Sequence, residues 1–416
     1  MRAAMTLAAF VLAAAAGAIA LRSNAPFAAA EAAAGAAADS PAVIDAAKYP
    51  SLQAALDAVP KRGGLVKLPP GDFPLTEPLV LRRAETRLVG AGPATHLINR
   101  NTAGLPGLIV RPADREANRR SRLWRVELAN FRVSGNSKSG DGVQMLGVNE
   151  LLIHAVTVDH NGGNGLHLVD CYEDPRICNS LITYNARAGL SILGGHDIVV
   201  SANQFEENQD AVRCIDSFNL CMTGNNLDDH LRNGVVIENT YGSVLSGNMI
   251  EECHRAAVVL DRDCYGNTIS ANVIAHNGSG VELRDAWGCA VSANTFTIVA
   301  ARALLVGPAA GRITITGNNF SNAHIGGKTR RDDAATGVVL EGASDVSVCG
   351  NVFTGLKGSA VQADANCLRV IFSGNVVSET PRGGGRPAVD IGGAKQTVLG
   401  PNAIGSRGGT TQEKQP

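Results

Sequence analysis

One short pattern of apolar and polar positions recurs along most of the chain from about residue 150 onward. It reads apolar, polar, small, asparagine, variable, apolar, as in Val200-Ser201-Ala202-Asn203-Gln204-Phe205 and Ile269-Ser270-Ala271-Asn272-Val273-Ile274. The asparagines fall at 203, 225, 248, 272, 294, 318, 351 and 375, which gives intervals of 22 to 24 residues apart from one of 33. We expect Asn179 to extend the series backward and Asn402 to extend it forward.

Each unit carries a second signal of the form glycine, apolar, variable, apolar, as in Gly165-Leu166-His167-Leu168 and Gly280-Val281-Glu282-Leu283. This alternation predicts half-buried strands. Two or three short strands in about 23 residues fit one coil of a parallel β-helix, in which each strand pairs with its equivalent one coil away. The chain is therefore predicted to be all-β, a single-stranded parallel β-helix of about ten coils.

The recurring asparagine stands between two strands, where the chain must turn sharply. Asn tolerates left-handed backbone angles, and its side-chain amide can bond to the asparagine of the next coil. Leucine-rich repeats have similar periods, but their leucine spacing is absent, and a β-propeller blade would need about 40 residues.

The segment before the repeats predicts a cap for the open end of the solenoid. Ser51 is a helix N-cap, followed by the short amphipathic helix Leu52-Gln53-Ala54-Ala55-Leu56. Strands are expected at 64–68, 78–82 and 86–90, with a turn at 69–73. A capping helix is physically expected because a bare solenoid end exposes apolar side chains and strand edges.

Three stretches of this segment resemble a known family. Ser51-Leu52-Gln53-Ala54-Ala55-Leu56, Leu68-Pro69-Pro70-Gly71-Asp72-Phe73 and Leu88-Val89-Gly90-Ala91-Gly92 are similar to the N-terminal signature of the pectate-lyase-like superfamily. The resemblance covers about 45–405 and implies a right-handed single-stranded parallel β-helix with a short N-terminal capping helix. The superfamily includes polysaccharide lyases, glycoside hydrolases, mannuronan epimerases, inulin fructotransferases and members that only bind or deacetylate sugar, so the reaction stays open.

The N-terminus predicts export. Arg2 precedes the apolar run Leu7 to Ala20, which is short for a membrane span, and Ala18-Ile19-Ala20 and Ala28-Ala29-Ala30 are candidate cleavage sites. An uncleaved membrane anchor is the alternative. We expect a signal peptide at 1–25, an alanine-rich linker at 26–42, the β-helix at 43–405 and a disordered tail at 406–416. The mature chain is predicted to be secreted or periplasmic, without a membrane span.

Charge and cysteine content narrow the partners. The formal net charge is -1, from 37 basic and 38 acidic residues, which argues against nucleic acid. Nine cysteines are present. Cys171/Cys178 and Cys214/Cys221 share a spacing of seven, and each pair either closes a disulfide loop or consists of free thiols, with Cys214 facing the core.

The candidate chemistry lies on the outward positions of the glycine-led strands, which form columns along the solenoid. The first column is predicted to contain Gln144, His167, Ser191, Arg213, Val236, Val259, Glu282 and Leu305. The second is predicted to contain Leu146, Val169, Leu193, Ile215, Glu238, Asp261 and Arg284. Charges concentrate between about 205 and 290, which favours a groove for an extended polymer.

Two catalytic interpretations follow from these columns. Glu238 and Asp261 are expected about 5 Å apart, and Asp261 and Glu282 about 8 Å apart, separations that hydrolases use. Alternatively, Arg213 or Arg284 neutralises a uronate carboxylate and His167, His230 or His254 abstracts a proton, as in a lyase or epimerase. A surface ion-pair ladder with no catalytic role is the third interpretation.

Other charged residues next to these strands are candidate substrate-binding groups: Asp210, His230, Arg232, His254, Arg255 and Asp285. Asp261, Asp263 and Asp285 offer oxygen ligands for Ca²⁺, and no other cofactor is indicated. Asp141 and Asp210 resemble polygalacturonase aspartates but are about three coils apart, with no Gly-His-Gly motif. Asp159-His160 departs from the Asp-Pro-His-Asp pattern of mannuronan epimerases.

The sequence therefore predicts a secreted carbohydrate-active protein that acts on an acidic polysaccharide as a lyase, epimerase or glycoside hydrolase. A non-catalytic surface or glycan-binding β-helix is the alternative. The oligomeric state is not indicated.

Overall fold

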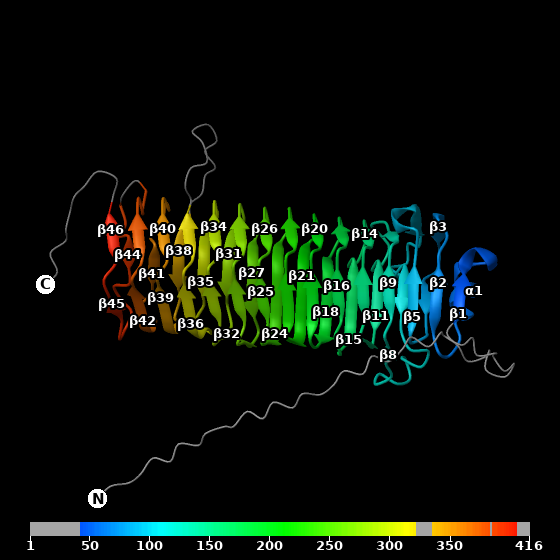
Figure 1. The fold of residues 1–416 in the computed structure, drawn as a ribbon. Coiled ribbons are helices and arrows are strands. Elements are labelled where there is room, and N and C mark those ends of the chain that lie inside the picture. The colour runs from blue at the N-terminus through cyan, green and yellow to red at the C-terminus, as the bar shows by residue number, and fades with distance from the viewer. Residues whose placement is uncertain (1–41, 322–334, 383–384, 406–416) are drawn as a thin grey trace, which may run out of the picture. The chain divides into compact units, whose positions relative to one another are not determined.

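The structure, a computed structural model, describes residues 42–321, 335–382 and 385–405. Strands stack coil upon coil from the N-terminal helix to the last strand (Figure 1). The expected signal peptide (1–25), all of the expected linker except Ala42, and the expected tail (406–416) lie outside the described residues. Ala42 already belongs to the first strand.

Three series of parallel strands build the coils. The first series, on which the glycine-led strands lie, comprises β4 (Leu79–Leu81), β7 (Leu108–Val110), β11 (Val143–Leu146), β15 (Leu166–Cys171), β18 (Ala188–Gly195), β21 (Asp210–Phe218), β24 (Asn233–Tyr241), β27 (Ala256–Asp261), β31 (Ser279–Leu283), β35 (Arg302–Val306), β38 (Thr336–Leu340), β41 (Val361–Ala363) and β44 (Val389–Asp390).

The second series follows it in each coil and comprises β1 (Ala42–Asp45), β2 (Gly64–Lys67), β5 (Thr86–Val89), β9 (Glu127–Ala129), β13 (Leu152–His154), β16 (Arg176–Cys178), β19 (Ile198–Ser201), β22 (Leu220–Thr223), β25 (Val244–Ser246), β29 (Thr268–Ser270), β33 (Ala290–Ser292), β36 (Gly311–Thr316), β39 (Ser344–Cys349), β42 (Leu368–Ser373) and β45 (Val398–Leu399). The short strands β28 (Cys264–Tyr265) and β32 (Ala286–Trp287) join the two series.

The third series is a separate 14-stranded sheet: β3 (Gly71–Leu75), β6 (Thr95–Asn99), β10 (Arg132–Ser134), β14 (Thr157–Asp159), β17 (Leu181–Thr183), β20 (Gln204–Glu206), β23 (Asn226–Asp228), β26 (Met249–Glu251), β30 (Val273–Ala275), β34 (Thr295–Thr297), β37 (Asn319–Ser321), β40 (Val352–Thr354), β43 (Val376–Ser378) and β46 (Ala403–Gly405). A two-stranded pair is formed by β8 (Leu123–Trp124) and β12 (Val148–Asn149).

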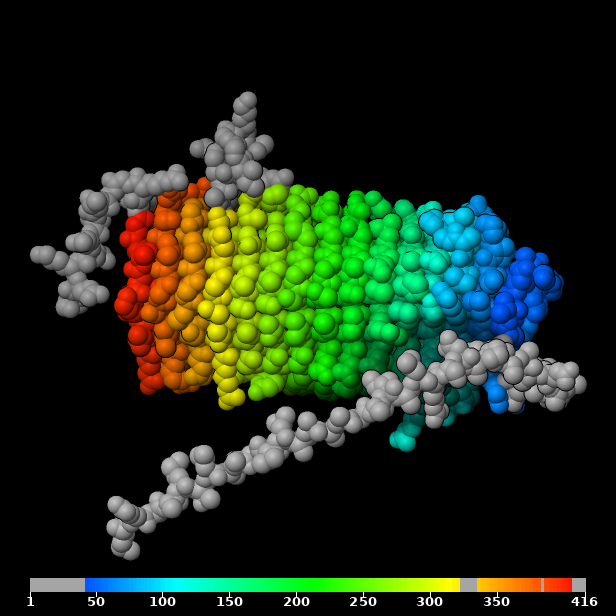
Figure 2. Space-filling view, viewed as in Figure 1, coloured from blue at the N-terminus to red at the C-terminus, as the bar shows by residue number. Residues whose placement is uncertain are grey.

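The solenoid has about 15 turns, so the expected ten coils were too few. The count failed because it followed the recurring asparagine, which marks only the later coils. The earlier coils have the same parallel pairing without that residue, as in β2 with β5 and β3 with β6. Figure 2 shows the described coils as successive bands of side chains.

Inward side chains pile up in register and form the core. Phe296, Phe320 and Phe353 come from three consecutive strands of the 14-stranded sheet, and their ring centroids are 4.7 Å apart at each step. That distance equals the spacing of hydrogen-bonded strands. All three rings are buried, so each coil needs its neighbours to bury its own apolar face.

The recurring asparagines form the expected ladder. Each side-chain amide donates to the Oδ1 of the asparagine one coil further on, at 2.9–3.1 Å, from Asn203 through Asn375 to Asn402. From Asn203 to Asn375, however, the left-handed residue is the small one before each asparagine, such as Ala202 or Gly224. Asn179 takes that preceding position, and Ser180 binds Asn203 in the ladder, so the backward extension was wrong by one residue.

A second ladder, which the repeat pattern did not indicate, follows the 14-stranded sheet. Asn161 donates to Asn185 and Asn185 to Asn208, at 2.9 and 2.8 Å. His230 takes the next position, where its Nδ1 accepts the backbone N–H of Asn208 at 3.2 Å. Asn277 continues the same role by accepting the backbone N–H of Cys253.

The N-terminal end has the expected helix. In α1 (Leu52–Asp57), Ser51 Oγ accepts the Ala54 N–H at 3.1 Å, and Ala55 and Leu56 are buried. Short 3-10 turns are η1 (Ala46–Lys48) and η2 (Gly92–Ala94). The expected turn at 69–73 is shorter, because β3 starts at Gly71.

All nine cysteines are free, so neither spacing-of-seven pair forms a disulfide, and Cys214 is buried in the core. Within the described ranges, no helix is long and apolar enough to cross a membrane.

Candidate functional site

Both outward columns of the first series have the expected register. Gln144 pairs with His167, His167 with Ser191 and Ser191 with Arg213. Further along, Val259 pairs with Glu282, and in the second column Glu238 pairs with Asp261. Side chains that are more than 20 residues apart in sequence are therefore neighbours on one surface.

Arginines separate the candidate carboxylates at the middle of this surface. The Glu238 carboxylate forms ion pairs with the guanidinium groups of Arg213 and Arg262, with N···O distances of 3.4 and 3.0 Å. Arg284 lies between Asp261, at 3.7 Å, and Glu282, at 2.7 Å. Because each carboxylate has a cationic partner, this region has the arrangement of an ion-pair ladder, and a pair of carboxylates poised for hydrolysis gains no support from it.

Two of the predicted substrate-binding residues are fully buried. The Asp210 carboxylate accepts the backbone N–H and the amide of Asn233 through Oδ1, at 3.0 and 2.9 Å. His230 belongs to the second asparagine ladder, and burial lowers its pKa to about 4. Neither side chain is exposed to solvent, so His230 is a core residue and its assignment as a proton abstractor or substrate ligand was wrong.

The remaining predicted binding residues are accessible but scattered. Arg232 is partly exposed and lies 3.9 Å from Asp210, while His254 and Arg255 are exposed. Asp285 accepts the backbone N–H of Asp263 at 2.9 Å. The structure does not bring these residues together around one point.

A hollow of about 310 Å³ lies instead at the N-terminal end of the charged columns. We call it the Asp141 cavity. Its lining consists of Gly104, Pro106, Ser139, Gly140, Asp141, Gln144, Gly162, Gly163 and Arg187. At Gly140, Gly162 and Gly163, an added Cβ would lie within 2.5 Å of a neighbouring atom. The glycines therefore let adjacent coils approach closely here.

Asp141 and His167 form a hydrogen-bonded pair beside this cavity. Asp141 Oδ2 is 2.9 Å from His167 Nδ1 and 3.3 Å from the Gln144 amide nitrogen. Asp141 Oδ1 accepts the backbone N–H and the amide of Asn164, at 2.7 and 2.9 Å. The contacts with Asn164 and Gln144 fix the orientation of the Asp141 carboxylate, and the carboxylate in turn orients the imidazole of His167.

The electrostatics favour an ionised Asp141. Burial by itself would raise the pKa of this carboxyl group, but the hydrogen bond and charge of His167 and the two donors of Asn164 outweigh burial and lower it. An ionised Asp141 holds a proton on Nδ1 of His167. Nε2 is then the nitrogen that is free to accept a proton.

Arg187 completes the cavity and was missed by the sequence analysis. It lines the hollow, its side chain is exposed, and no carboxylate in the described part of the chain forms an ion pair with it. Arg213 and Arg284, which the sequence suggested for this role, are already paired. Its position in the repeat could have identified Arg187 from the sequence, because it directly precedes β18, the strand one coil beyond His167.

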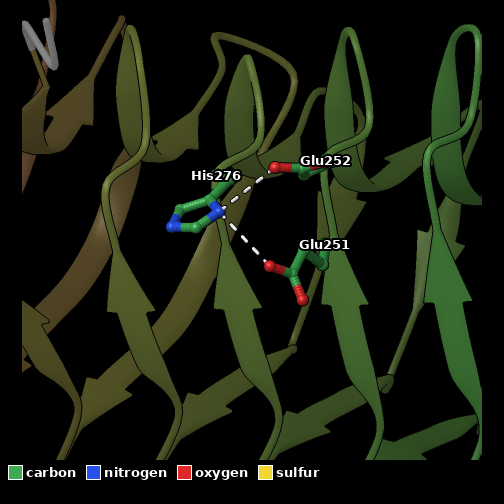
Figure 3. Close-up of side chains that lie close together, drawn as sticks. All are labelled: Glu251, Glu252 and His276. Atoms are coloured by element: carbon green, nitrogen blue, oxygen red, sulfur yellow. Dashed lines mark ion pairs between the residues drawn. The ribbon is translucent and has the colours of Figure 1, made fainter. Parts of the chain in front are cut away.

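Metal-ligating side chains converge elsewhere. In the described ranges, the groups whose ligand atoms converge are Glu251, Glu252 and His276, and Asp228, Asp229 and Glu252. His276 Nδ1 lies 3.2 Å from Glu251 and 3.4 Å from Glu252 (Figure 3). Asp261, Asp263 and Asp285 are not brought together in this way. Both clusters lie at the ends of strands of the 14-stranded sheet, and none of their residues lines the Asp141 cavity.

The coil architecture and its register define a parallel β-solenoid. The family model "Right handed beta helix region" matches residues 119–225, 141–320 and 233–386, and the chain belongs to this family. It is a right-handed parallel β-helix of the pectate-lyase-like kind. No curated protein sequence matches the chain.

Several solved structures are similar. The A-module of mannuronan C-5 epimerase AlgE6 from Azotobacter vinelandii is 17% identical, covers 87% of this chain and 94% of its own, and has a TM-score of 0.48. DFA-IIIase from Arthrobacter chlorophenolicus A6 is 13% identical, with 78% and 95% coverage and a TM-score of 0.49. Tailspike protein 3 of bacteriophage CBA120 is 14% identical, with 81% and 56% coverage and a TM-score of 0.47. At these identities, the likeness carries no conclusion about activity.

Proposed function

We propose that this protein is a secreted or periplasmic enzyme that acts on an acidic polysaccharide, with His167 as the base that removes a proton next to a uronate carboxylate. The observation that carries the proposal is the 2.9 Å contact of Asp141 with His167 Nδ1, beside a cavity that also contains Arg187. A base held by a carboxylate and an unpaired guanidinium are the two groups that this chemistry requires.

The chemistry follows from the charges. The guanidinium of Arg187 binds the uronate carboxylate bidentately and neutralises it, which acidifies the C5–H bond of the sugar. Nε2 of His167 takes that proton, and the electron pair of the C–H bond moves toward the carboxyl group. The electrons then either form a C4–C5 double bond and expel the glycosidic oxygen, which takes up a proton, or C5 is reprotonated from the opposite face.

These two outcomes are a lyase and an epimerase, and the proposal covers both. A hydrolase has less support because Glu238, Asp261 and Glu282 each have an arginine partner. The same ion pairs favour the second candidate function, a non-catalytic glycan-binding solenoid, because they leave the middle of the surface without a free acid.

The test is a panel of acidic and neutral polysaccharides, with and without calcium, followed by the ultraviolet absorbance of unsaturated uronides and by NMR of the uronate configuration. We expect wild-type protein to convert an acidic polymer, and His167→Gln to be slower by about 10²-fold or more. His154→Gln is the matched control, since His154 bonds Glu127 on a second-series strand, away from the cavity. A His167→Gln protein with wild-type turnover would exclude His167 as the base.

A further inference from the structure

One outward position at the end of the first series carries an aromatic ring on six consecutive coils. We call this column the aromatic track, and its members are Tyr172, His196, Phe218, Tyr241, Tyr265 and Trp287. Phe218 pairs in register with Tyr241, Tyr241 with Tyr265 and Tyr265 with Trp287. His196 reaches Phe218 with a centroid distance of 6.0 Å. At about 4.8 Å per coil, the column is about 24 Å long.

The concentration of rings here is unusual for this chain. It has only five tyrosines and two tryptophans, and three of those tyrosines and one tryptophan belong to the track. Phe218 and Tyr265 are 43% and 51% exposed, whereas most of the other described phenylalanines are buried in the core. A contiguous exposed apolar strip is a mark of a binding surface.

The backbone is shaped to support these rings. A Cβ added to Gly288 would contact the Tyr265 ring at 3.3 Å, and one added to Gly311 would approach Trp287 to 2.7 Å. The Tyr265 and Trp287 rings therefore each lean over a glycine of the next coil. The Tyr241 hydroxyl, which has one proton to donate, lies within hydrogen-bond distance of two oxygen acceptors, Asn239 Oδ1 at 3.1 Å and Asp263 Oδ2 at 3.0 Å. Tyr241, Tyr265 and Trp287 thus have fixed neighbours before any ligand binds, which lowers the entropic cost of binding.

The track is continuous with the charged columns. Strand β21 carries Arg213 and, at its end, Phe218, and strand β24 carries Glu238 and, at its end, Tyr241. A polymer that lies along the charged columns therefore passes beside the track. The track extends from the coil of His167, where Tyr172 directly follows β15, to the coil of Glu282 and Arg284, where Trp287 ends β32.

We propose that the aromatic track binds consecutive sugar rings of a polysaccharide by stacking their C–H faces on Phe218, Tyr241, Tyr265 and Trp287. Sugar rings combine an apolar face with hydroxyl groups at the edge, and aromatic side chains supply a matching apolar face. The identity of the polymer as acidic rests on the proposed function, but stacking itself needs no charge. The track therefore binds the part of the polysaccharide that extends beyond the Asp141 cavity.

The test compares binding of long and short chains in a His167→Gln background, in which the proposed function expects conversion of the ligand to be slowed about 10²-fold or more. Affinity electrophoresis and calorimetry are applied to the acidic and neutral polymers of the panel and to a short oligosaccharide of the bound polymer. We expect Tyr265→Ala/Trp287→Ala to raise the Kd for the long polymer about tenfold. Tyr265→Phe/Trp287→Phe keeps the rings and is expected to retain the affinity.

Tyr184→Ala is the matched control, because Tyr184 is 41% exposed and stacks on His160 beside the 14-stranded sheet. Equal Kd values for the wild-type rings and the double alanine variant would overturn the track and leave the proposed function standing. A protein that binds no polymer in the panel overturns both. A third outcome is that the wild-type protein self-associates, whereas the double alanine variant is monomeric and binds the polymer with unchanged affinity. That result would overturn the proposal and assign the rings to contact with a second copy of the chain.

Discussion

A single histidine shows how position decides the role of a residue. His230 replaces asparagine in the second ladder, where it accepts the Asn208 N–H, and its Nε2 has no hydrogen-bond partner among the described residues. His167 has the same side chain but is partly exposed beside Asp141. The sequence offered both as proton abstractors, and only burial distinguishes them.

Buried His230 makes stability depend on pH. Burial lowers its pKa to about 4 in the folded protein, against about 6.5 in the unfolded chain. As the pH falls from about 6.5 to 4, only the unfolded chain takes up this proton, so the folded state loses stability over that range. Between pH 7 and pH 5 the loss is about 2 kcal/mol.

His230→Asn is therefore expected to remove about 2 kcal/mol of the difference in unfolding free energy between pH 7 and pH 5. Urea denaturation at both pH values measures this difference. His254→Asn, at an exposed position on the next coil, controls for the loss of a histidine. The same pH dependence in His230→Asn and wild type would show that His230 titrates normally in the folded protein.

At the scale of the repeated element, the asparagine ladder satisfies backbone groups that a coil cannot satisfy by itself. The Asn272 amide donates to Leu245 O and to Asn294 Oδ1, both at 3.0 Å. Its Oδ1 accepts the backbone N–H and the amide of Asn248, also at 3.0 Å. Removing this side chain leaves buried donors and acceptors unpaired on both neighbouring coils.

We expect Asn272→Ala to lower the free energy of unfolding by about 3 kcal/mol. Asn226→Ala is the control, because Asn226 is half-buried and bonds only the Gln204 side chain through its amide; its loss is expected to cost less than about 1 kcal/mol. Equal urea midpoints for the two variants would mean that the ladder does not stabilise the coils.

The period and the alternation within each coil were sufficient to predict these elements and the register of both outward columns. The left-handed position was not predicted, because Asn and its small neighbour both tolerate that conformation. Only the structure shows that Ala202 adopts it and Asn203 does not. The second ladder was missed for a related reason, since Asn161, Asn185, Asn208 and His230 share no single residue type.

At the scale of the whole molecule, the candidate site depends on how successive coils stack on one another. Asp141 and His167 are 26 residues apart in sequence and meet because their coils are adjacent. The sequence predicted the columns but not the cavity. The shape of the cavity depends on glycine contacts between coils. Its free cation depends on ion pairs that occupy Arg213 and Arg284, whereas Arg187 has no carboxylate partner among the described residues. Those features depend on side-chain conformations that a repeat pattern does not specify.

Because the Asp141 carboxylate orients His167 from the adjacent coil, we expect Asp141→Asn to impair activity by misorienting His167. Asparagine keeps the size of the side chain but presents an amide to Nδ1, which no longer fixes one tautomer. We expect turnover of the acidic polymer to fall by about 10²-fold or more, with an unchanged urea midpoint at pH 7 as the control for folding. Undiminished turnover in a folded Asp141→Asn protein would contradict the orienting role.

The most direct measurement follows the hydrogen itself. A uronate polymer that carries a hydrogen isotope at C5 is incubated with wild type, His167→Gln and His154→Gln, and release of the label into water is recorded. Lyase and epimerase chemistry both release it. The account predicts release by wild type and His154→Gln but not by His167→Gln; conversion of the polymer with the label retained at C5 would contradict it.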